Sequence, residues 1–231
     1  LEVDTRRLQQ MTRNGGNKSE LQVSPDGRFA TYLESGDLWS VVLADGTIAR
    51  LTEVGVPGLS NVPVGRYNRP EVEVGPGIWG GPTYAWSPDR RLLIDRASDT
   101  AVDRWLDVMD PGSGHIQRIW HSNRPTWIYT SFAASWHPDG RQVPFSSDFE
   151  DRYGLYRLDP ATGRHERLST ADHDLLGGFS VVPDAAVVFY NANDPHPSEQ
   201  QVFSIALDSG AARRVTYLSG NNNGTPSPDG S

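Results

Sequence analysis

One stretch of the sequence brings together side chains that could transfer a proton. His121, Arg124, Tyr129 and His137 follow one another closely, and a histidine, a tyrosine and an arginine can together neutralise the carboxylate of a uronate and move its proton. We favour a structural alternative, in which His121 lies in a surface connection and His137 fills a turn position that is otherwise serine.

Other groupings of reactive residue types are weaker. Asp172, His173 and Asp174 are three possible metal ligands in a row, but neighbours on an extended chain point in alternating directions, so a shared ion would need further ligands. Residues 75–80 match the glycine spacing of a dinucleotide fingerprint without the strand-to-helix transition that such a site requires. No Gly-x-Ser-x-Gly nucleophile elbow occurs. We therefore expect no catalytic residue, no metal site and no cofactor in this chain.

The elements that would position these residues repeat along the chain. Five segments share a Pro-Asp turn, four of them with Ser or His in front: 24–28, 87–91, 137–141, 182–186 and 227–231. Proline presets the second turn position, aspartate can accept a hydrogen bond from the backbone ahead, and glycine, where present, takes a positive φ. The last three turn prolines, at 138, 183 and 228, are 45 residues apart, whereas the first two intervals are 63 and 50. The long first interval indicates an insertion.

Short strand-like segments follow each turn in a fixed order. Residues just after the turn are β-branched or aromatic (29–33, 187–190), a third segment ends at a glycine-bearing turn (37–43, 202–207), and a fourth closes the unit (48–52, 212–216). Pro144 weakens the second segment of the third unit. This pattern predicts an all-β fold, a β-propeller of four-stranded antiparallel blades. A β-sandwich also has many short strands, but it gives no reason for one turn to recur at the same place.

The repeat also divides the chain. We expect a single β-propeller, or a propeller segment, over residues 1–231, with units at about 21–52, 84–120, 134–169 and 179–216 and an insertion at 53–83. Residues 1–12 and 225–231 align with parts of further blades, which gives four complete blades plus a split or partial fifth. An open seam would leave exposed strand edges, so we favour a segment of a larger ring whose total blade number stays open.

Composition restricts the partners. The chain has 21 basic and 29 acidic residues, a net charge of −8, which argues against nucleic acid or an anionic membrane surface as the main partner. No apolar run approaches the ~20 residues that span a bilayer, so we expect no membrane span. The absence of cysteine excludes disulfides and thiolate metal sites. The compartment stays open between periplasmic or secreted and cytoplasmic in a bacterium.

The last two units have the most specific sequence features. Residues 155–163 and 165–169 close one unit, and residues 188–194, 199–203 and 213–216 form the next. In these segments the chain resembles the N-terminal β-propeller of dipeptidyl peptidase IV-like serine peptidases of the prolyl oligopeptidase superfamily, with TolB-like repeats. The resemblance covers roughly residues 20–231. It implies a domain that gates and docks peptide substrate without carrying the catalytic triad, next to an α/β-hydrolase domain that this chain lacks.

The resemblance also implies a substrate-binding site. In that family, adjacent glutamates in an insertion of an early blade bind the amino terminus of the substrate through charge-assisted hydrogen bonds. The insertion here holds Glu71 and Glu73, which depart from that pattern by one intervening residue. On a strand this spacing would place both carboxylates on one face. They are the candidate clamp for an ammonium group, and a solvated strand face is the alternative.

Two other functions stay open from the sequence. The first is a stand-alone propeller enzyme, such as a polysaccharide (uronate) lyase that uses the histidine group described above. The second is a non-catalytic TolB-like scaffold that binds a protein partner. The first would turn over a uronate, and the second would turn over nothing.

Overall fold

The computed structural model describes residues 9–34, 37–52, 84–97, 102–126, 133–148, 150, 152–170 and 172–227. Within these ranges the protein is built from strands, with one 3-10 turn (Pro183–Ala185) and no α-helix. Among these residues no helix is long and apolar enough to cross a membrane. The all-β prediction is therefore confirmed.

Four antiparallel sheets follow one another along the chain, and within each sheet every strand pairs with its neighbour in sequence. We call them blades 1 to 4. Blade 1 contains β1 (Ser19–Val23), β2 (Phe29–Glu34), β3 (Asp37–Val42) and β4 (Ile48–Arg50). Blade 2 contains β5 (Tyr84–Trp86), β6 (Leu92–Ala97), β7 (Asp103–Met109) and β8 (Ile116–Asn123). Blade 3 contains β9 (Val143–Ser147), β10 (Gly154–Leu158) and β11 (His165–Arg167). Blade 4 contains β12 (Leu175–Val182), β13 (Val187–Asn193), β14 (Gln200–Ala206) and β15 (Ala212–Arg214).

Blade 3 has three full strands, because its first strand is reduced to a single bridge between Ala134 and Phe145. The cause is Pro144, whose carbonyl accepts a hydrogen bond from the Ser135 amide at 3.0 Å. The amide and carbonyl of one strand residue point to the same side in an antiparallel pair, and proline has no N–H to return the bond. Pro144 therefore weakens the pairing of the neighbouring first strand. Its own strand β9, which the sequence analysis expected to be weakened, is intact.

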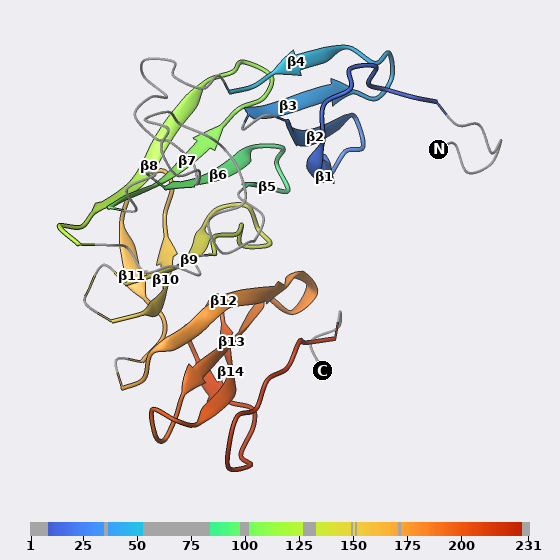
Figure 1. Cartoon of the computed structure of the whole chain (residues 1–231). Coiled ribbons are helices and arrows are strands. Elements are labelled where there is room, and N and C mark those ends of the chain that lie inside the picture. The colour runs from blue at the N-terminus through green and yellow to red at the C-terminus, as the bar shows by residue number, and fades with distance from the viewer. Residues whose placement is uncertain are drawn as a thin grey trace.

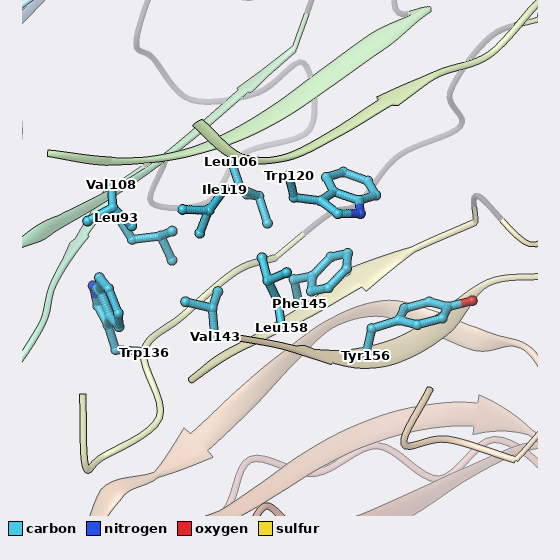
Figure 2. Close-up of a cluster of buried hydrophobic side chains, with 10 residues drawn as sticks. All are labelled: Leu93, Leu106, Val108, Ile119, Trp120, Trp136, Val143, Phe145, Tyr156 and Leu158. Carbon is cyan, nitrogen blue, oxygen red and sulfur yellow. The ribbon is translucent and has the colours of Figure 1, made fainter. Parts of the chain in front are cut away.

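Each blade packs its face against the next, and Figure 1 shows the four sheets following one another along an arc. Buried clusters fill the three interfaces between consecutive blades. Between blades 2 and 3, side chains from β6 to β8 face side chains from 136–158, as Figure 2 shows. Trp120 meets Phe145 there with ring centroids 4.9 Å apart. The tryptophans before the turns reach back to the preceding blade: Trp86 Nε1 donates to Thr31 Oγ1 at 3.0 Å and Trp136 Nε1 to the Ala85 carbonyl at 3.1 Å.

The repeated turns fold as their residues predict. Asp26 accepts from the Arg28 amide at 3.1 Å, and Asp139 accepts from the Arg141 amide at 2.8 Å. Gly27 and Gly140 take φ of 67° and 73°. Blade 2 has no glycine at this place, and Arg90 adopts the positive φ instead, at 71°. In blade 4 the positive φ lies one residue later, at Ala186 with 48°, after the 3-10 turn. The turn geometry thus survives the loss of its glycine in blade 2 and shifts by one residue in blade 4.

The two ends of each blade carry different connections. The turn end holds the Pro-Asp turns and the hairpins between the third and fourth strands, where Gly46, Gly114, Gly163 and Gly210 have positive φ. The opposite end holds the connection from the second strand to the third. We call it the ion-pair end after the arginine–carboxylate pairs that form there, although ion pairs such as Arg91–Asp89 also occur at the turn end.

Candidate functional site

The ion-pair end is built by a motif that closes three of the blades. Their fourth strands end in Arg, an aliphatic residue and then Ser or Thr, at residues 50–52, 167–169 and 214–216. Each hydroxyl accepts the amide hydrogen of a buried residue on the third strand, at 2.9–3.0 Å; the pairs are Thr52 with Leu38, Ser169 with Leu155, and Thr216 with Val202. This bond fixes the outer strand and points the arginine before it toward the end of the blade.

Each of these arginines meets a carboxylate at the same end. Arg50 Nε lies 3.1 Å from Asp37 Oδ2, Arg214 Nη1 lies 2.9 Å from Asp194 Oδ2, and Arg167 Nη1 lies 3.9 Å from Glu150 Oε2. Most of these groups are partly exposed, so they remain open to a charged ligand. The arrangement can bind and orient groups of either charge.

Blade 2 buries its charges instead. Arg104 is 1% exposed, donates through Nε to Asp95 Oδ1 at 2.9 Å, and also donates to the Ser146 carbonyl of blade 3. On the face toward blade 1, Arg96 contacts Asp107, and burial lowers the pKa of Arg96 to about 9. Arg104 therefore couples blade 2 to blade 3, whereas the Arg96–Asp107 pair lies within blade 2.

Two tyrosines complete this end on blade 3. Tyr156 Oη donates to Glu150 Oε2 at 3.2 Å, and burial raises the pKa of Tyr156 to about 12. Burial likewise raises the pKa of Tyr153 to about 12. Both phenols are therefore neutral near pH 7 and serve as hydrogen-bonding groups.

The predicted substrate-binding residues Glu71 and Glu73 lie outside the described residues, as does the whole insertion 53–83. The residues that flank it are well placed. Thr52 Oγ1 donates to Asp37 Oδ1 at 3.1 Å, and Tyr84 opens β5 opposite Ile94, before the chain runs to the turn end. Thr52 therefore lies at the ion-pair end, and Tyr84 lies midway along blade 2.

The two histidines of the proton-transfer hypothesis lie apart, at opposite ends of their blades. His121 lies opposite Trp105 near the ion-pair end, stacked on its ring at 5.2 Å, and its Nε2 lies 2.9 Å from Asp103 Oδ1. His137 lies at the turn end, where its Nδ1 accepts from the Asp139 amide at 3.2 Å, and thus takes the place that serine has in blades 1 and 2. The Arg124 amide bonds the Val102 carbonyl at 2.7 Å, while Tyr129 is outside the described residues.

Asp172, His173 and Asp174 also diverge, as expected for an extended chain. His173 is 8% exposed and packs on Phe203 at 4.5 Å. Asp174 turns the other way and pairs with Arg152, with two N···O distances of 3.1 Å. No three His, Asp or Glu side chains in the described part of the chain gather as metal ligands would.

The sequence analysis missed the buried pair of Asp95 and Arg104. A signal was present, because both charges stand in strands whose neighbouring residues are apolar, at 92–94 and 105–106. Charged residues at positions that face a core are expected to be paired. The pairing itself depends on a strand register that the spacing does not give.

Comparison with known proteins agrees with this architecture. Residues 82–231 match the family described as the dipeptidyl peptidase IV (DPP IV) N-terminal region. Dipeptidyl peptidase 4 of Porphyromonas gingivalis has a similar fold, with a TM-score of 0.58 at 13% identity over 92% of this chain and 41% of that chain. The predicted resemblance to this family is therefore confirmed.

Other solved propellers are similar as well. TolB of Acinetobacter baumannii has a TM-score of 0.60 at 16% identity over 95% of this chain and 48% of that chain. Oligogalacturonate lyase of Vibrio parahaemolyticus has a TM-score of 0.65 at 12% identity over 90% of this chain and 55% of that chain. The chain thus spans about half the length of these proteins. At such identities the likeness establishes the fold alone.

Proposed function

Because the chain belongs to the family of dipeptidyl peptidase IV N-terminal regions, we propose that it is the propeller domain of a serine peptidase of this type, which gates and docks peptide substrate without carrying the catalytic triad. The α/β-hydrolase domain of such a peptidase would be its partner. Binding, positioning and access are then the tasks of this chain.

One observation supports the proposal: the chain leaves blade 1 at Thr52, at the ion-pair end, and enters blade 2 at Tyr84, midway along that blade. The segment between them holds Glu71 and Glu73. We propose that this segment brings the two carboxylates to the ion-pair end, where they would suit a peptide with a free ammonium group. The Asp194–Arg214 and Glu150–Arg167 pairs offer further charged groups of both signs on that end.

The test is binding of fluorescently labelled peptides with either a free or an acetylated amino terminus, measured by anisotropy with the purified chain. Losing a hydrogen bond between two charged groups costs about 1.5–3 kcal/mol, so acetylation should weaken binding by roughly 10- to 100-fold. Glu71→Gln and Glu73→Gln should each remove most of this preference. Asp184→Asn, which deletes one exposed carboxylate at the turn end, is the matched control and should leave it unchanged.

Equal binding of both peptides, or an unchanged preference in the two glutamate variants, would contradict the clamp. Hydrolysis of a dipeptidyl chromogenic substrate by this chain alone would contradict a purely binding role. The lyase alternative has no support from the geometry, because His121 and His137 lie at opposite ends of their blades. A TolB-like scaffold would bind a protein and neither peptide.

A further inference from the structure

Two buried histidines lie at the same interface, the one between blades 3 and 4. His137 is 3% exposed and His173 is 8% exposed, and they are the buried histidines among the described residues. His137 lies at the turn end of the interface and His173 at its ion-pair end. Because histidine is the side chain whose charge ordinarily changes between pH 5 and 8, the His173 ring can make the ion-pair end of this interface respond to pH.

The turn end surrounds His137 with carboxylates. Its Nδ1 lies 2.8 Å from Asp139 Oδ1 of its own turn, and its Nε2 lies 3.4 Å from Asp208 Oδ1 in the hairpin of blade 4. Nδ1 also accepts the Asp139 amide hydrogen at 3.2 Å, which ties the ring to its own turn, while Nε2 faces the hairpin of blade 4.

Arginine side chains beside His137 tie neighbouring blades together at the turn end. Arg157 of β10 donates to the Leu207 carbonyl and, at 3.0 Å, to the Asp208 carbonyl, which holds the hairpin of blade 4 beside blade 3. From blade 2, Arg91 donates to the Gly140 carbonyl at 2.8 Å, and its charge is paired with Asp89. The turn end of the interface between blades 3 and 4 is therefore held by bonds that do not involve the His137 ring.

The ion-pair end places His173 in the opposite environment. Its Nδ1 lies 3.4 Å from Thr170 Oγ1 and its Nε2 lies 3.4 Å from Tyr190 Oη, while its ring packs on Phe203. Burial lowers the pKa of His173 and outweighs the nearby carboxylates; the charged groups around it are Asp172, Asp194, Arg152 and Arg167. Protonation there puts a charge into an aromatic core.

The residues next to His173 also form the main-chain contact between the two blades. The Leu175 amide donates to the Tyr153 carbonyl at 2.9 Å, and the Tyr153 amide donates to Asp174 Oδ1 at 3.2 Å. Expelling the charged ring would pull on residues 172–175 and so on these two bonds. The Asp174–Arg152 pair would remain on the exposed side.

We propose that the interface between blades 3 and 4 is a pH-sensitive joint, which loosens at the ion-pair end on acidification while its turn end stays clamped. The neutral His173 ring closes the joint at pH 7. Acid drives that ring out of the core, while the Arg157 bonds to the hairpin of blade 4 hold the other end. This inference depends on the fold alone and is independent of the proposed peptidase role.

Hydrogen–deuterium exchange of the whole chain at pH 7.5 and pH 5.5 tests the joint, after correction for the pH dependence of intrinsic exchange. We expect amides in 172–176 to exchange faster at pH 5.5, by at most about tenfold, because pH 5.5 lies about one unit below the ordinary pKa of histidine. Amides of the His137 turn should show no such increase. Exchange in 172–176 that differs by less than about twofold between the two pH values overturns the proposal.

Three variants locate the effect. His173→Phe keeps a ring against Phe203 but cannot be protonated, and it should abolish the pH difference in 172–176; His173→Gln gives the same comparison if the phenylalanine packs poorly. His137→Ser, which installs the residue of Ser24 and Ser87, changes the other buried histidine of the interface and should leave the pH difference in 172–176 unchanged. His115→Phe, at an exposed hairpin, is the second control and should leave it unchanged as well. A pH difference that persists in both His173 variants refutes the joint.

Discussion

The buried pair of Arg104 and Asp95 predicts a large effect from a single substitution. Arg104 is 1% exposed, and Asp95 accepts hydrogen bonds from its Nε and Nη2 while its Nη1 reaches the Ser146 carbonyl of blade 3. Removing one partner of a buried ion pair costs about 3–5 kcal/mol. The Asp95 side chain is 16% exposed, so water can partly replace it, and we expect Asp95→Ala to lower the free energy of unfolding by about 3 kcal/mol.

Urea unfolding followed by tryptophan fluorescence measures this loss, because Trp120 and Trp136 lie in the same interface. The double variant Asp95→Ala with Arg104→Met removes both charges and should cost at least about 1 kcal/mol less than the sum of the single variants. Asp103→Ala is the control, since it opens the half-exposed His121 pair and should cost no more than about 1 kcal/mol. A loss for Asp95→Ala as small as that of the control, or strict additivity, would refute the reasoning.

Three further predictions concern the repeat itself. Gly140 has a φ of 73°, so Gly140→Ala should lower the free energy of unfolding in urea by about 1 kcal/mol. Gly112 is not among the positive-φ glycines, and Gly112→Ala should change that free energy by less than about 0.5 kcal/mol. Equal effects of the two substitutions would contradict this prediction. Ser169→Ala leaves a buried third-strand amide without its hydroxyl acceptor and should cost about 2 kcal/mol, and a neutral result would show that the hydroxyl is dispensable. The hydrogen bond and charge of Arg152 lower the pKa of Asp174 in the folded protein. The contribution of Asp174 to stability is therefore present above about pH 4 and is lost as the pH falls through its lowered folded pKa. Asp174→Asn should flatten the dependence of the thermal unfolding temperature on pH between pH 5 and 3, and an unchanged slope would contradict this.

The repeat made the fold predictable because each local signal agreed with the others. A Pro-Asp turn, a β-branched segment and a glycine hairpin recur in the same order, and each strand pairs with its sequence neighbour, so no long-range register had to be inferred. The tryptophans at 86 and 136 could be placed in the core for the same reason. Their bonds to Thr31 and to the Ala85 carbonyl follow from the repeated position before the turn.

Contacts between blades could not be predicted in the same way. Arg104 and Ser146 are 42 residues apart, and His137 meets an aspartate at position 208. Such pairs depend on which face of a strand turns toward the next blade, and one residue of slip reverses every face. The turn of blade 2 illustrates the problem, because it is one residue shorter: the Ser87 amide bonds the carbonyl of residue 91, whereas the Ser24 amide bonds that of residue 29.

The departures from the repeat are where this chain differs from a generic propeller blade. Counting from the turn bonds, Asp95 occupies the place that Leu33 has in blade 1, and His137 occupies the place of Ser24. Leu33 is 3% exposed and fills an interface with apolar surface, so the fold does not need a charge at this position. A chain with Asp95→Leu and Arg104→Leu together should therefore fold, because apolar residues often replace a buried ion pair at little or no cost in stability. It would lose the charged link from blade 2 to the Ser146 carbonyl, and any change in the motion of blade 3 against blade 2 could then be assigned to that link.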